Sequence, residues 1–98
     1  MPANILVVED EPAIQELLAL NITQAGHTPM RAISAEHAQE LLRNALPDLI
    51  LLDWMLPKMS GIDFARQLKS DSATKQIPII MLTARGDEFD KVRGLEVG

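Results

Sequence analysis

Three short apolar runs alternate with segments of helical periodicity along the chain. The runs are Ile5–Val8, Leu49–Leu52 and Ile79–Leu82. They lack the polar alternation of half-exposed strands, which is typical of strands buried on both faces of a parallel sheet. A weaker segment, Thr28–Ile33, is predicted to be an edge strand, because Pro29 is tolerated at a sheet edge.

Helical segments separate the predicted strands. The first begins at Pro12 and ends at Gly26, residue types that are common at helix starts and ends. The second follows the N-cap residue Ser34, and the third begins with the capping-box-like pair Ser60 and Asp63. Within the first helix, a stripe of mostly apolar residues follows helical spacing: Ile14, Leu17, Leu18, Asn21, Ile22 and Ala25.

This alternation predicts one α/β domain over residues 1–98. Right-handed crossovers leave few arrangements, of which the favoured one is a doubly wound parallel sheet with strand order 2-1-3-4. A last helix is expected to begin at Asp87 and to end at Gly98. The ligand site of such a sheet lies beyond the carboxyl ends of the strands, where the strand order reverses.

Composition excludes several classes of protein. The chain has no cysteine, so disulfide and zinc–thiolate chemistry are absent. The net charge is −5, and nothing in the chain forms a basic footprint for nucleic acid. The apolar runs are far shorter than the roughly 20 residues of a membrane span. We therefore expect a cytoplasmic domain with no membrane contact.

Oxygen-bearing side chains follow each of the three buried runs. Glu9, Asp10 and Glu11 come after the first, Asp53 ends the second, and Thr83 follows the third. Adjacent parallel strands would bring the carboxylates of Glu9, Asp10 and Asp53 together at one edge of the sheet. Such a cluster repels itself unless a cation occupies it. We expect Glu11 to act instead as a cap of the following helix.

A cluster that offers only oxygen ligands suits a hard ion such as Mg²⁺. Mg²⁺ usually shares its coordination sphere with phosphate, so the cluster indicates phosphoryl chemistry. The carboxylate of Asp53 can itself be the nucleophile and form an aspartyl phosphate.

Three segments also carry a family pattern: Val7–Pro12, Asp48–Pro57 with Ser60–Gly61, and Pro78–Ala84. The residue types, their order and their spacing resemble the receiver domain of bacterial response regulators. Within this family the segments are most similar to the OmpR/PhoB group. The resemblance implies a flavodoxin/CheY-like fold. It also implies a phosphorylation-dependent signalling switch that assists only its own phosphorylation and dephosphorylation and is not an enzyme.

The same resemblance implies a role for each site residue. Asp53 is the phosphoacceptor for the phosphohistidine of a sensor histidine kinase. Asp10 and Asp53 are direct Mg²⁺ ligands, and Glu9 acts through a metal-bound water. The backbone carbonyl of Met55 is a further ligand.

Two more positions match the end of the fourth strand. Thr83 corresponds to the hydroxyl that moves to bond the phosphoryl oxygen, and the small Ala84 leaves access to the site.

The family pattern continues beyond residue 98 with a fifth strand, which ends in a lysine, and a fifth helix. We therefore expect this chain to be an incomplete receiver domain. In a full-length protein we expect a DNA-binding effector domain downstream, with dimerisation on phosphorylation and contact with DNA only through the effector.

Two other functions are weighed against the switch. A phosphatase of the haloacid dehalogenase type would use an Asp-x-Asp pair, whereas the chain offers Glu9-Asp10-Glu11 and Asp53-Trp54-Met55. A pseudo-receiver would bind partners without taking phosphate; the intact acid cluster argues against this alternative, whereas the missing lysine favours it for this chain.

Overall fold

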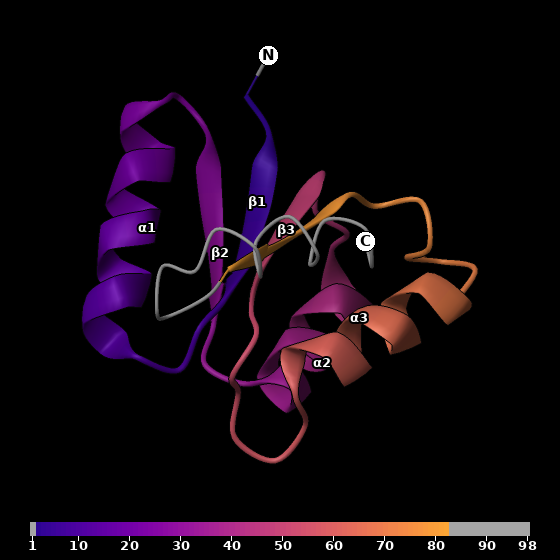
Figure 1. Cartoon of the computed structure of the whole chain (residues 1–98). Coiled ribbons are helices and arrows are strands. Elements are labelled where there is room, and N and C mark those ends of the chain that lie inside the picture. Colours follow the sequence, from indigo (N-terminus) through magenta and orange to yellow (C-terminus); the bar gives the residue numbers. More distant parts are fainter. Residues whose placement is uncertain (1, 83–98) are drawn as a thin grey trace.

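The computed structural model describes residues 2–82, which form a parallel sheet with helices on both faces (Figure 1). Its elements follow one another along the chain: β1 (Asn4–Val8), α1 (Pro12–Gln24), β2 (Thr28–Ala32), α2 (Ala35–Asn44), β3 (Leu49–Asp53), α3 (Gly61–Ser70) and β4 (Ile79–Leu82). Thr83, Ala84 and the helix predicted from Asp87 lie outside the described residues. Within residues 2–82, no helix combines the length and apolar character that a membrane crossing requires.

The described strands lie in the order β2-β1-β3-β4, and every neighbouring pair is parallel. This confirms the predicted doubly wound sheet and its strand order. β2 pairs only with β1 among the described strands, so the segment that contains Pro29 is an edge strand, one residue shorter than predicted. Side chains of successive strand residues point to opposite faces, which divides the core in two.

The larger half of the core lies under α2 and α3, which share one face of the sheet (Figure 1). Its centre is formed by Leu6, Val8, Ile50, Leu52, Phe64 and Met81, all without exposed surface. α1 covers the opposite face, where Ile5, Val7 and Ile22 form a smaller buried cluster. Because both faces carry apolar residues, β1 and β3 need continuous apolar runs, as the sequence has them.

Both predicted serine caps are confirmed. Ser34 Oγ accepts a hydrogen bond of 3.0 Å from the backbone N–H of His37 at the start of α2. Ser60 Oγ accepts one of 3.2 Å from the N–H of Asp63 at the start of α3. Each bond satisfies one of the N–H groups that a helix leaves unpaired in its first turn.

The stripe predicted for α1 is only partly buried. Ile22 is buried and Ile14 and Leu18 are half-buried, as predicted, whereas Leu17 keeps 58% of its surface exposed. The helix also buries Gln15 and Ala19, which lie outside the predicted stripe. Apolar residues occur on several sides of this helix, so periodicity alone does not identify the side that meets the sheet. The buried side includes a glutamine, because Gln15 donates hydrogen bonds to the backbone carbonyl groups of Glu9 and Ala32.

Candidate metal and phosphoryl site

The chain reverses its direction of winding between β1 and β3. After β1 it passes to α1 on one face of the sheet, and after β3 to α3 on the other (Figure 1). The carboxyl ends of these two adjacent strands therefore open a crevice that neither connection covers. The three predicted acids lie at this point.

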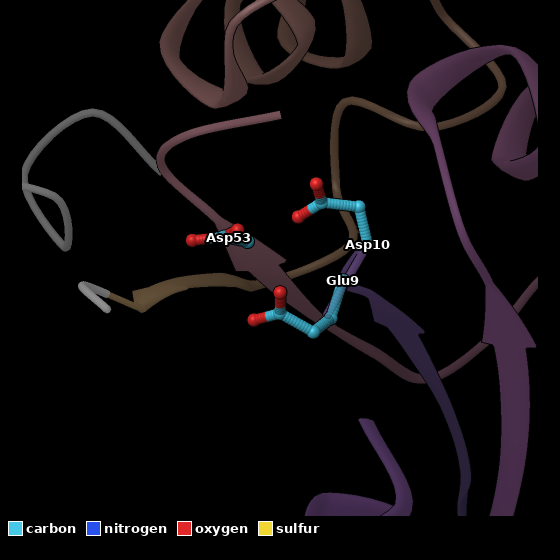
Figure 2. Close-up of side chains that lie close together, drawn as sticks. All are labelled: Glu9, Asp10 and Asp53. Atoms are coloured by element: carbon cyan, nitrogen blue, oxygen red, sulfur yellow. The ribbon is translucent and has the colours of Figure 1, made fainter. Parts of the chain in front are cut away.

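Glu9, Asp10 and Asp53 form one cluster. Each contributes a carboxylate oxygen, and these three atoms lie within 4.8 Å of one another. Figure 2 shows the side chains of Glu9 and Asp10, from the end of β1, turned towards Asp53 at the end of β3. Glu9 and Asp53 are each only 2% exposed, while Asp10 is exposed and leaves the cluster open on one side.

Backbone N–H groups hold the two buried carboxylates. Glu9 Oε2 accepts a hydrogen bond of 2.9 Å from the N–H of Glu11. Asp53 Oδ1 accepts a longer one, of 3.3 Å, from the N–H of Met55. Glu11 occupies the N-cap position of α1, but its side chain makes no capping bond, so its predicted capping role is wrong. The carboxylate of Glu9 instead supplies an acceptor at this turn.

Burial changes the acidity of the cluster. Removal from water raises the pKa of Glu9 to about 7, against the bond from the Glu11 N–H, and the nearby charge of Asp53 adds to the rise. Burial also raises the pKa of Asp53; the Met55 N–H opposes this effect, and the charge of Asp10 adds to it. The buried acids thus compete for ionisation, as carboxylates at close range do.

The cluster fits a small divalent cation. Its donors are all oxygens, two are buried, and the exposed side at Asp10 leaves room for water or phosphate. The ion pairs found between described residues, Arg31–Glu16 and Arg66–Asp63, do not involve the cluster. A bound Mg²⁺ would therefore neutralise charge that no described basic side chain pairs with.

Gly61 brings the start of α3 against the end of β3. Its N–H donates to the carbonyl of Trp54 at 2.9 Å. A Cβ at this position would lie 2.2 Å from the backbone oxygen of Asp53, so only glycine fits. The sequence indicated a helix start here, but the close approach to Asp53 depends on the packing of α3 beneath the loop.

Gln15 is a second residue that sequence reasoning missed. It is buried at the start of α1 and contacts the backbone of Glu9. One sequence signal could have found it: a polar residue in the first turn of the helix that directly follows the strand-end acids Glu9 and Asp10.

A family comparison agrees with the geometry. Residues 5–98 match the family model described as the response regulator receiver domain. The chain is 52% identical over 98 residues to the phosphate regulon transcriptional regulatory protein PhoB of Escherichia coli K12. The match covers 100% of this chain and 43% of that protein. It is 46% identical over 98 residues to the transcriptional regulatory protein AfsQ1 of Streptomyces coelicolor, covering 100% of this chain and 42% of that protein.

Solved structures of response regulators have the same fold. The chemotaxis response regulator CheY4 of Vibrio cholerae superposes with a TM-score of 0.86 at 28% identity, over 100% of this chain and 82% of that one. The N-terminal domain of a response regulator receiver protein from Methanoculleus marisnigri gives 0.85 at 35% identity, over 97% and 77%. The chain thus spans less than half of the two curated relatives and most of the two receiver structures.

Proposed function

The chain belongs to the response regulator receiver domain family, and from this premise we propose that Asp53 accepts a phosphoryl group from the phosphohistidine of a sensor histidine kinase in a Mg²⁺-dependent reaction. The observation that carries the proposal is the buried Asp53 carboxylate within 4.8 Å of two further acids at the reversal of strand order. A receiver domain related to PhoB has a phosphorylation-dependent signalling role, so this chain is a signalling domain rather than a classical enzyme.

The chain's own residues account for the transfer. A carboxylate oxygen of Asp53 attacks the phosphorus, the phosphorus–nitrogen bond breaks, and the histidine ring retains the electron pair and takes up a proton. The Met55 N–H orients the attacking carboxylate. Asp10, Asp53, the Met55 carbonyl and, through a water, Glu9 would hold the metal. Bound Mg²⁺ neutralises the negative charge of the phosphoryl oxygens.

The family resemblance supports two further roles. We assign to the Thr83 hydroxyl the hydrogen bond to the new phosphoryl oxygen, and to Ala84 the open access above Asp53. Phosphorylation replaces the singly charged carboxylate by a doubly charged phosphoryl group at the strand end, and a hydroxyl that follows this group turns a chemical change into a change of conformation.

The relatives indicate the larger protein in which such a domain acts. The chain spans 43% of the length of a phosphate regulon regulator, and 52% of the 98 aligned residues are identical. We propose residues 1–98 as the receiver part of a cytoplasmic transcriptional regulator of the phosphate regulon. A downstream effector domain would bind DNA, and phosphorylation would promote dimerisation.

The proposal is tested by titrating Mg²⁺ and then acetyl phosphate while following Trp54 fluorescence and the intact mass. We expect a saturable response to Mg²⁺ and a gain of one phosphoryl group that requires the metal. Asp53→Asn should abolish the mass gain. Asp71→Asn, a similar change at the far end of α3, should leave it intact.

The same experiment distinguishes the alternatives. Continuous release of phosphate from an added ester would favour the phosphatase. A Mg²⁺ response without any mass gain would favour the pseudo-receiver. Loss of both responses in a folded chain would contradict the proposed function outright.

A further inference from the structure

Gln15 is a polar side chain buried in the first turn of α1, next to the acid cluster. We infer that Gln15 is a positioning residue, whose carboxamide holds the end of β1 so that Glu9 and Asp10 face Asp53 in the geometry that Mg²⁺ requires. The inference rests on the proposed function and deepens it, because metal binding would then depend on a residue that is not itself a ligand.

Both N–H groups of the carboxamide have a partner at a strand end. Gln15 Nε2 donates at 2.9 Å to the backbone oxygen of Glu9 and at 2.9 Å to that of Ala32. Ala32 is the last residue of β2, and Glu9 follows the last residue of β1. One side chain thus joins the carboxyl ends of two strands to the helix that covers them.

The turn after β1 is held at both ends. The Glu9 N–H donates to the oxygen of Ala32 at 3.0 Å, the Glu9 oxygen accepts from Gln15, and the Glu9 carboxylate accepts from the Glu11 N–H. Asp10 lies between the two anchored residues. The direction of the Glu9 and Asp10 side chains therefore depends on a backbone that Gln15 restrains.

The orientation of the carboxamide is itself determined. Gln15 Oε1 accepts a hydrogen bond of 3.1 Å from Arg31 Nε. Rotation of the amide by half a turn would place its oxygen against two carbonyl oxygens and its N–H groups against a guanidinium. Arg31 in turn forms an ion pair of 2.8 Å with Glu16, the residue that follows Gln15 in α1. The network permits only one arrangement.

Restraint of this kind matters for Mg²⁺ in particular. The ion demands near-ideal octahedral geometry, and a site loses function when its ligands shift by more than about 0.5 Å. Loss of a group that orients a ligand typically weakens metal affinity by about 10–100-fold. An apolar residue at position 15 would bury equally well, but it would remove the side-chain donor to the Glu9 oxygen.

The first test compares Gln15→Met with Thr74→Val. Methionine keeps the length of the side chain and removes both donors. Thr74 lies in the loop after α3, away from the acids. It is also buried, and its hydroxyl donates a hydrogen bond to the backbone oxygen of Leu68. Both variants should lower Tm. Only Gln15→Met should raise the Mg²⁺ Kd, followed by Trp54 fluorescence, by about 10-fold or more, and only it should speed hydrogen exchange of the Glu11 amide.

A second variant keeps the test decisive if Gln15→Met does not fold. Arg31→Met removes the donor to Gln15 Oε1 at an exposed position. Charge alone predicts tighter Mg²⁺ binding, because a positive group is lost; the positioning role predicts weaker binding. Glu16→Gln removes the charge that pairs with Arg31 but leaves the bond to Gln15, so it should change the affinity less than Arg31→Met.

The outcomes separate the two proposals. Wild-type binding of Mg²⁺ with unchanged affinity in Gln15→Met, or in Arg31→Met if the first variant is unfolded, overturns the positioning role and leaves the proposed function intact. Absence of Mg²⁺ binding by the folded wild type overturns both. Weaker binding in Gln15→Met and Arg31→Met, with normal binding in Thr74→Val, supports both.

Discussion

At the scale of single residues, Gly61 at the start of α3 lies directly against the backbone of Asp53, with no room for a side chain. Gly61→Ala should destabilise the chain by about 1–3 kcal/mol, because the new Cβ would lie 2.2 Å from the Asp53 backbone oxygen. It should also weaken Mg²⁺ binding, because either the loop or the strand end must move. Urea unfolding and the Mg²⁺ titration measure the two effects.

Gly26→Ala is the matched control for that variant. Gly26 has φ +90°, but nothing lies within 4 Å of an added Cβ. It should therefore cost about 1 kcal/mol through backbone strain alone and leave the Mg²⁺ affinity unchanged. Equal affinities in all three proteins would show that Gly61 does not act on the site.

Glu9 gives the metal-free chain an unusual dependence on pH. Burial raises its pKa from 4.5 to about 7, so between these values the folded state holds a proton that the unfolded state has lost. The free energy of unfolding should therefore fall as pH rises through this range, and the raised pKa of Asp53 acts in the same direction. Urea unfolding at about pH 5 and about pH 8 measures the change.

Glu9→Gln should remove much of this slope, because an amide does not titrate. Asp48→Asn is a suitable control, since Asp48 is an exposed acid outside the cluster. A slope that survives in Glu9→Gln and matches that of the control would contradict the assignment to Glu9.

At the scale of elements, α1 shows that a helix can be predicted correctly and its buried side only in part. Leu17→Gln should change stability by less than about 0.5 kcal/mol, because Leu17 is largely exposed. Ile22→Ala, on the same helix, should cost about 2–4 kcal/mol, because Ile22 is buried against β1. Thermal unfolding of both variants measures the two changes; a larger loss in Leu17→Gln than in Ile22→Ala would contradict the burial of Ile22 and the exposure of Leu17.

At the scale of the whole molecule, the acid cluster couples metal binding to folding. At ten times its Kd, Mg²⁺ should add roughly 1.4 kcal/mol of stability above pH 7, where the ionised carboxylates bind it and the unfolded chain does not. For a domain of this size that corresponds to a rise in Tm of about 7 °C. A chelator should reverse the rise, and Asp53→Asn should reduce it. An unchanged Tm at saturating Mg²⁺ would contradict a site at this cluster.

The strand-end acids could be predicted from sequence because their placement depends only on where the buried strands end and on which strands are adjacent. Asp53 directly ends a buried run and Glu9 and Asp10 directly follow one, so adjacent parallel strands bring all three to the same edge. Gln15 and Gly61 could not be found in this way. Their roles depend on contacts between α1 and two strand ends, and between α3 and Asp53, and such contacts leave no periodic signal.

The amino-acid sequence by itself determined the succession of strands and helices, the parallel order 2-1-3-4, the serine caps and the candidate acid cluster. These follow from local patterns and from the chirality of strand connections. Only the tertiary structure decided which side of α1 is buried, that the carboxylate of Glu9 rather than Glu11 bonds the turn, and that Gln15 joins β1 to β2. Burial and hydrogen-bond partners are properties of surfaces that meet, and which surfaces meet is not encoded in the local pattern of either one.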